Sequence, residues 1–447
     1  MKRIVTREDY VQSLKDLRSV VYYNGKRVED VTGHPAMQPH INSAALTYEL
    51  ALRPENEDLL TAVSHLTGKK INRFTHIHQS VDDLIIEAAY EAYQDAGIEQ
   101  KEIQAAWFGT TRLITGENLA GVLKFDYIPV TRVENLCATG SDALRNAAFA
   151  VAAGVYDIVL AIGAEKLKDV GMGGLDSSEI QPTSRVDYPG TPPAHFFARM
   201  ATRYMHEYGL TEAELKQALA KIAVKNHHNG SLNPKAHFQR EITIEQAMNA
   251  PIISWPLGLY DACGVSDGAA AAILTRADMA RSFRDDYILI KGMGLATGAR
   301  QGFLQQDYDF VHLEETLRAS RQAFAVAGVR NAFEEIDVAE VHDCFTITEM
   351  VLYEDLGFCP RGKAKEYIDA GTFELDGKLA VNPDGGLKCF GHPLGASGLR
   401  MVYEIYKQLQ GKAGPRQRKN PRLGLTHNHG MNPGSGVGSI TILGRRD

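Results

Sequence analysis

The sequence is poor in cysteine and has no long apolar run. Its five cysteines are too few and too dispersed for a disulfide framework, and no CxxC pair suggests a zinc site. A reducing cytoplasm is therefore the expected location. The N-terminus lacks the apolar stretch of a signal peptide, and no run reaches the ~18–20 apolar residues of a membrane span, so we expect no association with a membrane.

Neither sign of charge is in large excess. The net charge is −7, and the basic residues are scattered apart from one short group, which comprises Arg416, Arg418, Lys419 and Arg422. Because a phosphate backbone needs a contiguous basic face, nucleic-acid binding is disfavoured. This basic group could contact the phosphates of a nucleotide-like cofactor, but we favour a solvated loop.

What the chain does contain is typical of a large globular protein. It has 447 residues, of which 44% are hydrophobic and 41 are glycine, and this favours two to four domains with many tight turns. Residues 1–80 contain no glycine-rich catalytic loop. At Ser80 an N-cap and an acidic first turn introduce an amphipathic helix over 84–96, so we place a domain boundary there.

Strand and helix patterns alternate after this boundary. Residues 105–109 and 157–162 are typical of buried strands joined to alanine-rich helices, which predicts an α/β fold. Small residues lead into a buried strand at both 268–274 and 438–443, which suggests that the fold is duplicated.

One long segment interrupts the alternation. Residues 168–250 are polar, carry five histidines and contain several proline turns, so they are typical of an insertion that covers a site. The predicted domains are 1–80, 81–285 with this insertion, and 286–447.

The sharpest local pattern surrounds Cys137, which stands in Asn135–Ser141 just before a small-residue helix over 142–153. A cysteine where a loop turns into a helix meets the positive end of the helix dipole and free backbone N–H groups, which favour the thiolate. Cys137 is therefore a candidate nucleophile. The alternative is a small buried apolar residue, which is the commoner role of a lone cysteine.

His392 lies in a glycine-rich loop, residues 385–398, and not on an apolar face. Glycines let the backbone approach a ligand closely, and a histidine buried in a core would not need five of them nearby. An imidazole in such a loop can take the proton of a thiol and later donate to a thioester oxygen. His392 is therefore the candidate base.

A second candidate group is His342-Asp343-Cys344-Phe345, between a predicted strand over 338–341 and a predicted helix over 346–355. Open α/β sheets place reactive side chains at the C-terminal ends of strands. His342 could donate to an oxyanion and Cys344 could shuttle a proton, whereas Asp343 is interpreted as a helix cap. Cys263, in a tight turn before a buried strand, is interpreted as structural.

The tail Thr426–Gly436 is polar and rich in glycine. We interpret it as a flexible loop whose backbone N–H groups could line an oxyanion hole. His427 and His429 stand there without a carboxylate or thiolate beside them, so a metal is not expected.

Together these segments resemble the thiolase family, and specifically its sterol-carrier-protein type branch, over about residues 81–447. The Asn-x-Cys-x-x-Gly loop at Asn135–Gly140, the His-Asp-Cys-Phe segment at His342–Phe345 and the Gly-His-Pro loop at Gly391–Pro393 occur in the order of the family. Three matching segments are more specific than any one alone.

The resemblance implies a duplicated, five-layered α-β-α-β-α thiolase fold, with 168–250 as the loop domain that covers CoA. It implies a homodimer or homotetramer that takes acyl-CoA and CoA as substrates and needs no cofactor. In some members of this branch a small zinc-containing OB-fold protein is an accessory partner, so such a partner is expected here as well.

The resemblance also implies roles for five residues. Cys137 would take up the acyl group. His392 would activate Cys137 and would form the first oxyanion hole with His342. Cys344 would handle the proton of the second substrate, and the backbone N–H groups of Cys137 and Gly430 would form the second oxyanion hole.

Residues 5–83 resemble a different family, the N-terminal segment of the flavin-dependent 4-hydroxybutyryl-CoA dehydratases and 4-hydroxyphenylacetate 3-hydroxylases. The likeness lies in Gly33-His34-Pro35 and in Leu66–Ser80. It stops before the residues that hold the iron–sulfur cluster of the dehydratase, so it implies no flavin or cluster chemistry. The apolar strand that opens the thiolase fold is not visible before residue 81. The chain therefore resembles a fusion of an extra, mainly helical segment with a thiolase that lacks its first strand.

The preferred function is acyl transfer, either thiolytic cleavage of a 3-oxoacyl-CoA by CoA or the reverse Claisen condensation. A thiolase-like aldolase would cleave a carbon–carbon bond without an acyl-enzyme, and the combination of Cys137, Cys344 and His392 argues against it. The alternative from another class is a non-catalytic scaffold that binds a CoA ester or a partner protein.

Overall fold

The chain divides into two compact units, Met1–Ser80 and Val81–Asp447. The computed structural model describes residues 6–16, 20–23, 25–54, 61–63, 70–72, 80–111, 114–168, 193–299 and 308–446. None of the helices in these ranges is long and apolar enough to cross a bilayer.

The first unit consists mainly of two helices, as expected, and adds two small hairpins. The helices are α1 (Arg7–Asp16) and α2 (Gln38–Ala51), and the hairpins pair β1 (Val21–Tyr23) with β2 (Lys26–Val28) and β3 (Thr61–Val63) with β4 (Lys70–Asn72). Tyr10 stacks on Tyr48 with ring centres 5.2 Å apart, so the two helices lie against each other.

The second unit contains two sheets of the same design. The first has the strand order β10-β7-β5-β6, and the second has the order β11-β15-β14-β12-β13. In each sheet three neighbouring strands are parallel, β7-β5-β6 or β14-β12-β13, and one long strand, β10 or β15, pairs antiparallel with the first of them. The first sheet consists of β5 (Ala105–Gly109), β6 (Val130–Val133), β7 (Ile158–Lys166) and β10 (Asp267–Thr275). The second consists of β11 (Leu289–Thr297), β12 (Val338–Glu340), β13 (Ala380–Val381), β14 (Leu423–Asn432) and β15 (Ser435–Gly444). The predicted duplication is therefore present.

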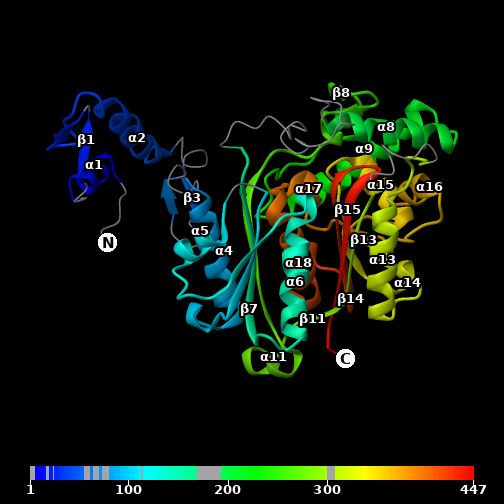
Figure 1. Ribbon diagram of the computed structural model, residues 1–447. Helices are drawn as coiled ribbons and strands as arrows, with labels where there is room; N and C mark the ends of the chain where they lie inside the picture. Colours follow the sequence, from blue (N-terminus) through cyan, green and yellow to red (C-terminus); the bar gives the residue numbers. More distant parts are fainter. Residues whose placement is uncertain are drawn as a thin grey trace. The chain divides into compact units, whose positions relative to one another are not determined.

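Helices form three layers around the two sheets. The helices α6 (Thr139–Ala152) and α18 (Leu394–Gln410) contact each other and both sheets, so they form the central layer. On the outer side of the first sheet lie α4 (Val81–Ala96) and α5 (Gly116–Leu123), and α13 (Glu314–Ala327) covers the second sheet. Figure 1 shows these layers side by side in the predicted order α-β-α-β-α.

Glycine allows the central layer to approach the first sheet. A Cβ atom on Gly163 of β7 would lie only 2.0 Å from the carbonyl oxygen of Gly395, at the start of α18. The first turn of α18, which belongs to the second half, therefore packs directly on the backbone of the first sheet.

The segment between β7 and β10 is mainly helical in its described part. It contains α8 (Pro193–Glu207), α9 (Glu212–Ser231), α10 (Ile244–Met248) and a hairpin of β8 (Ile252–Ser254) and β9 (Leu257–Gly258). Helix α9 contacts α15 (Thr346–Asp355), α16 (Ala364–Asp369) and α17 (Gly386–Cys389) of the second half. Residues 169–192 of the predicted insertion lie outside the described residues. The remaining short helices are α11 (Ala277–Phe283), α14 (Ala332–Glu335), η3 (Gln100–Glu102), η4 (Leu136–Ala138), η5 (Leu259–Asp261) and η6 (Gly414–Arg416).

The prediction of a flexible tail is wrong. Residues 426–436 belong to the hairpin of β14 and β15, which is paired continuously from Leu423 opposite Gly444 to Asn432 opposite Ser435. All ten residues of β15 are buried. The polar side chains of this hairpin misled the prediction because they are buried in the structure, where Asn428 Oδ1 accepts from Ser141 Oγ at 2.7 Å.

The interpretation of the basic group as a solvated loop is also wrong for two of its residues. Arg416 is buried and pairs with Glu404 at 2.9 Å. Arg418 donates to the carbonyl oxygens of Leu375 and Gly377 at 2.7 and 2.8 Å. These guanidinium groups bind the chain itself and are not free for phosphates.

Candidate active site

Cys137 follows β6 of the first sheet in the chain and lies against the central layer and the β14–β15 hairpin of the second half. It occupies the short turn η4, directly before α6, and its side chain is 7% exposed. Burial raises the pKa of the Cys137 thiol, while its own backbone N–H group and that of Met431 oppose this rise. Because burial dominates, the thiol stays protonated at neutral pH and needs a base before it can attack.

Two histidines of the second half meet Cys137. Its sulfur and one ring nitrogen each of His342 and His392 lie within 4.8 Å of one another, and all three side chains are buried. The two imidazole rings are 5.3 Å apart in an edge-on arrangement. The structure therefore brings together the predicted nucleophile, the predicted base and the predicted oxyanion donor.

The proton on His392 can be placed from its hydrogen bonds. Ser397 Oγ lies 2.8 Å from His392 Nδ1 and 3.0 Å from the carbonyl oxygen of Pro393. When Ser397 donates its single hydrogen to this carbonyl, it accepts from His392 Nδ1, and Nε2 then has a free lone pair. No protein group in the described residues bonds Nε2.

Burial keeps both imidazoles neutral. It lowers the pKa of His392 to about 3, with a further contribution from the positive charge of Arg400. The pKa of His342 is lowered well below its usual value by burial and then by His392. A neutral His392 with a free Nε2 is the form that can accept a thiol proton.

Cys344 follows β12, and Cys263 lies beside it. It is buried, and its sulfur lies 4.0 Å from Thr348 Oγ1. The backbone N–H of Cys263 donates to the carbonyl oxygen of Cys344 at 2.9 Å, and Ala262 pairs with Phe345 in an isolated bridge. Burial raises the pKa of Cys344, and the neighbouring thiols of Cys263 and Cys137 add to the rise. Cys263, interpreted above as structural, therefore lies beside the site.

Gly430 packs against the loop of Cys137. A Cβ atom at this position would lie 2.4 Å from the carbonyl oxygen of Asn135 and 3.3 Å from the nitrogen of Cys137. Only glycine allows this approach. Its role in the second oxyanion hole stays a prediction. The backbone N–H of Met431, which sequence reasoning missed, lies on the same strand and opposes the rise in the pKa of Cys137.

Asp343 is not the cap of α15, because Phe345 occupies that position. Its carboxylate accepts from the backbone N–H groups of Leu387 and Lys388, at 2.6 and 3.2 Å, and from Asn226 Nδ2 at 2.8 Å. It thereby fixes the His342–Phe345 segment to the glycine-rich loop and to α9. Burial raises the pKa of Asp343 to about 7, and the nearby carboxylate of Glu349 acts in the same direction.

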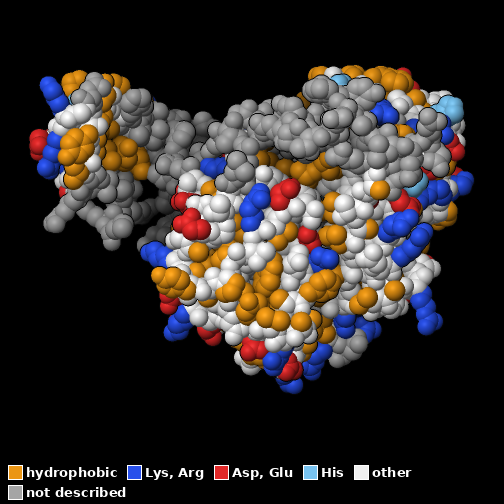
Figure 2. Space-filling model, viewed as in Figure 1, with side chains coloured by type: hydrophobic (Ala, Val, Ile, Leu, Met, Phe, Trp, Pro, Cys, Tyr) orange, Lys and Arg blue, Asp and Glu red, His pale blue; other side chains and the backbone are white. Residues whose placement is uncertain are grey.

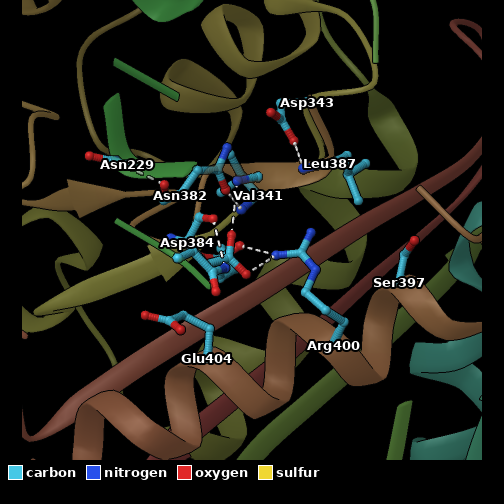
Figure 3. A network of polar contacts seen from close by, with 12 residues as sticks. Asn229, Val341, Asp343, Asn382, Asp384, Leu387, Ser397, Arg400 and Glu404 are labelled. Atoms are coloured by element: carbon cyan, nitrogen blue, oxygen red, sulfur yellow. Dashed lines mark hydrogen bonds and ion pairs between the residues drawn. The ribbon is translucent and has the colours of Figure 1, made fainter. Parts of the chain in front are cut away.

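A buried ionic network supports both histidine segments (Figure 3). Arg400 of α18 reaches the carboxylates of Glu340 and Asp384, with 2.6 Å to Glu340. Asn382 Oδ1 accepts from the backbone N–H of Val341 at 2.8 Å, and the Asn382 carbonyl accepts from Asn229. Nothing local in the sequence marks these residues, because their partners stand far away along the chain.

Three models of protein families match this chain. The thiolase N-terminal domain matches residues 69–278, and the thiolase C-terminal domain-like model matches residues 296–445. The model of the 4-hydroxyphenylacetate 3-hydroxylase N terminus matches residues 6–100, which confirms the second resemblance.

Individual relatives agree with the two thiolase matches. An acetyl-CoA acetyltransferase of Methanothermobacter thermautotrophicus is 39% identical over 378 residues, which are 82% of this chain and 95% of that protein. Sterol carrier protein 2 of Gallus gallus is 34% identical over 374 residues, which are 79% of this chain and 66% of that protein. A solved structure described as the Ltp2-ChsH2(DUF35) aldolase is 28% identical and covers 82% of this chain and 93% of its own, with a TM-score of 0.71. With its duplicated sheets and its paired Cys137 and His392, the chain belongs to the thiolase family.

Proposed function

We propose that the chain is an acyl-CoA acyltransferase that cleaves a 3-oxoacyl-CoA with CoA, or runs the reverse condensation, through an acyl-enzyme on Cys137. The observation that carries the proposal is the convergence of Cys137, His342 and His392 within 4.8 Å in a buried site. The relative named acetyl-CoA acetyltransferase supports the same chemistry. CoA and acyl-CoA are the only small molecules that this reaction requires, and the absence of a cofactor and the cytoplasmic location stay predictions.

In the first half of the proposed reaction, His392 Nε2 accepts the thiol proton while Cys137 attacks the 3-oxo carbon of the substrate. The bond between the second and third carbons of the acyl chain then breaks. The acyl group remains on Cys137 as a thioester, and the electron pair of the broken bond forms the enolate of acetyl-CoA, which takes a proton from Cys344.

In the second half, the thiol of CoA transfers its proton to Cys344 and attacks the thioester. The acyl group leaves on CoA, and the proton of His392 returns to Cys137. His342, His392 and the backbone N–H groups of Cys137 and Gly430 are the proposed donors to the oxyanions of the two steps.

Cleavage of acetoacetyl-CoA by CoA, followed through loss of the enolate absorbance, tests the proposal. Cys137→Ala should lower kcat by at least about 1,000-fold, because an acyl-enzyme cannot form without the sulfur. The matched control is Cys359→Ala, which changes another buried cysteine outside the site and should retain activity. Activity that survives in folded Cys137→Ala would contradict the acyl-enzyme.

An aldolase is the second candidate, because the Ltp2-ChsH2(DUF35) structure is described as one. An aldolase would cleave a 3-hydroxyacyl-CoA to an aldehyde or ketone and would not need a thioester on Cys137. Formation of a carbonyl product by Cys137→Ala would establish that reaction instead. The description of that structure names two components, which supports an accessory partner here, and the proposed partner is the zinc-containing OB-fold protein expected above.

A further inference from the structure

The two sheets of the second unit differ at one edge. In the second sheet, β11 pairs with β15 from Leu289 opposite Gly444 to Thr297 opposite Val437. In the first sheet, β10 takes the place of β15, and no strand of the described residues pairs with its outer edge. Eight of the nine residues of β10 are only partly buried, whereas all ten residues of β15 are buried. Among the described residues, the first sheet therefore has one strand fewer than its duplicate.

Helix α4, which lies beside the outer edge of β10, resembles α13, the helix on which β11 packs. Gly292 and Gly294 of β11 pack on α13, where their Cβ atoms would lie 2.4 Å from the Ala323 carbonyl and 2.0 Å from the Ala319 carbonyl. Ala327 completes this alanine row, one residue before Gly328 with φ 75°. The corresponding helix α4 also ends before a left-handed glycine, Gly97 with φ 70°.

Counting back from Gly97 gives the same alanine row on α4. Ala88, Ala92 and Ala96 stand at the same distances before Gly97 as Ala319, Ala323 and Ala327 stand before Gly328. Ala319 and Ala323 are fully buried under β11, whereas Ala88 and Ala92 are only partly buried. We call the space between the outer edge of β10 and this alanine row of α4 the open slot.

Long side chains of the described residues reach across the open slot. Asp95 of α4 accepts from Tyr406 Oη at 2.6 Å and from Arg284 at 2.6 Å, and Glu91 pairs with Lys235 at 2.7 Å. Glu91 and Lys235 are each more than two-fifths exposed, and exposed pairs of this kind hold a structure together weakly. An entering strand can therefore displace the pair of Glu91 and Lys235.

The chemistry of the slot defines its occupant. A strand that pairs with β10 offers alternate side chains to α4 and to the central layer. On the α4 side it needs two glycines spaced two residues apart, as in β11, and on the other side it needs apolar residues. The stretch of this chain just before α4, residues 69–80, contains no glycine, and its residues Lys70–Asn72 are paired with β3.

We propose that the open slot binds an extended apolar strand with an x-Gly-x-Gly pattern from another polypeptide, which completes the first sheet. Main-chain hydrogen bonds to β10 supply the affinity. The alanine row supplies the specificity, because a strand can pack closely on α4 only where it carries glycine. The full chain is thus one component of an assembly that is joined by strand addition.

The probe is a synthetic peptide with the sequence of residues 287–298, the strand that fills the equivalent place in the second half. Fluorescence anisotropy and thermal unfolding of the full chain should show saturable binding and a rise of about 2–4 °C in the thermal midpoint. The same peptide with valine in place of Gly292 and Gly294 is the control, and it should neither bind nor stabilise the chain.

Variants of the chain locate the binding. Ala92→Leu fills the alanine row and should abolish binding, whereas Ala152→Leu, at an exposed alanine of α6, should leave it unchanged. No saturable binding at millimolar peptide, equal binding of the valine peptide, or undiminished binding to Ala92→Leu would each overturn the proposal. These readouts do not depend on the acyltransferase activity.

Discussion

At the scale of single residues, the hydrogen bond between His392 and Ser397 determines what His392 can do. When Ser397 donates its hydrogen to the Pro393 carbonyl, His392 holds its proton on Nδ1. The lone pair of Nε2, which no group of the described residues bonds, is then free to accept the thiol proton of Cys137. Ser397 is therefore a positioning residue that sets the tautomer of the base.

Removing the Ser397 hydroxyl should impair the base and leave the fold in place. We expect Ser397→Ala to lower kcat for acetoacetyl-CoA cleavage by about 10- to 100-fold with little change in KM, which is the usual effect of losing a partner that orients a reactive group. Ser320→Ala, which changes a buried serine of α13, is the matched control. Equal kcat values for Ser397→Ala and the unaltered chain would refute this role.

Buried neutral histidines also make stability depend on pH. Burial lowers the pKa of His227 to about 4, with Lys388 acting in the same direction. The unfolded chain binds a proton at His227 below about pH 6.5, while the folded chain does so only below about pH 4, so stability falls as pH drops through this window.

Urea unfolding at pH 7 and pH 5 measures this dependence. His227→Gln should reduce the loss of stability between the two pH values by about 1 kcal/mol, because one titrating group is removed. His228→Gln, at the exposed neighbouring position of the same helix, serves as the control for the substitution itself. If His227→Gln and the unaltered chain lose the same stability, His227 already binds its proton in the folded state.

At the scale of elements, Arg400 ties α18 to the ends of two segments of the second half. It is buried together with the carboxylates of Glu340 and Asp384. Arg400→Met should lower the free energy of unfolding by about 3–5 kcal/mol, since it leaves two carboxylates without a positive partner. Arg145→Met, which removes a partly exposed pair with Asp142, should cost less than about 1 kcal/mol. Chemical denaturation compares the two variants, and similar losses would show that the Arg400 network contributes no more than a surface pair.

The elements that could be predicted from the sequence are those with a strong local pattern. The amphipathic helix over 84–96 and the strand over 105–109 are α4 and β5, and the cysteine and histidine loops converge as three motifs in family order predict. The hairpin of β14 and β15 was missed because polar residues such as Asn428 are satisfied by partners hundreds of residues away. The role of Asp343 was missed for the same reason, since its partners belong to α9 and α17.

At the scale of the whole molecule, one face is apolar enough to be an interface. Figure 2 shows hydrophobic side chains gathered on the face where Figure 1 shows α6. Phe149 of α6 is 50% exposed and Val155, just after this helix, is 63% exposed. The short strand β6 is the neighbouring edge strand of the first sheet among the described residues. These features support the homodimer that the family resemblance implies.

Light scattering coupled to gel filtration tests the dimer. The chain should elute with about twice its mass of 49.1 kDa, and Phe149→Asp should shift it towards the monomer because a charge would be buried in the interface. Val326→Asp, at an exposed apolar position of α13, should not change the mass. A dimer that withstands Phe149→Asp would place the interface elsewhere.

The shared central layer has a consequence for how the chain is made on the ribosome. The inner face of the first sheet is covered partly by α18, which starts at Leu394, and Gly163 is fitted to the first turn of that helix. At a synthesis rate of about 5–20 residues per second, α18 emerges roughly 10–50 s after β7. During this interval the nascent first half presents an incompletely covered apolar sheet, so we expect chaperones to engage the chain between the appearance of β7 and the release of α18.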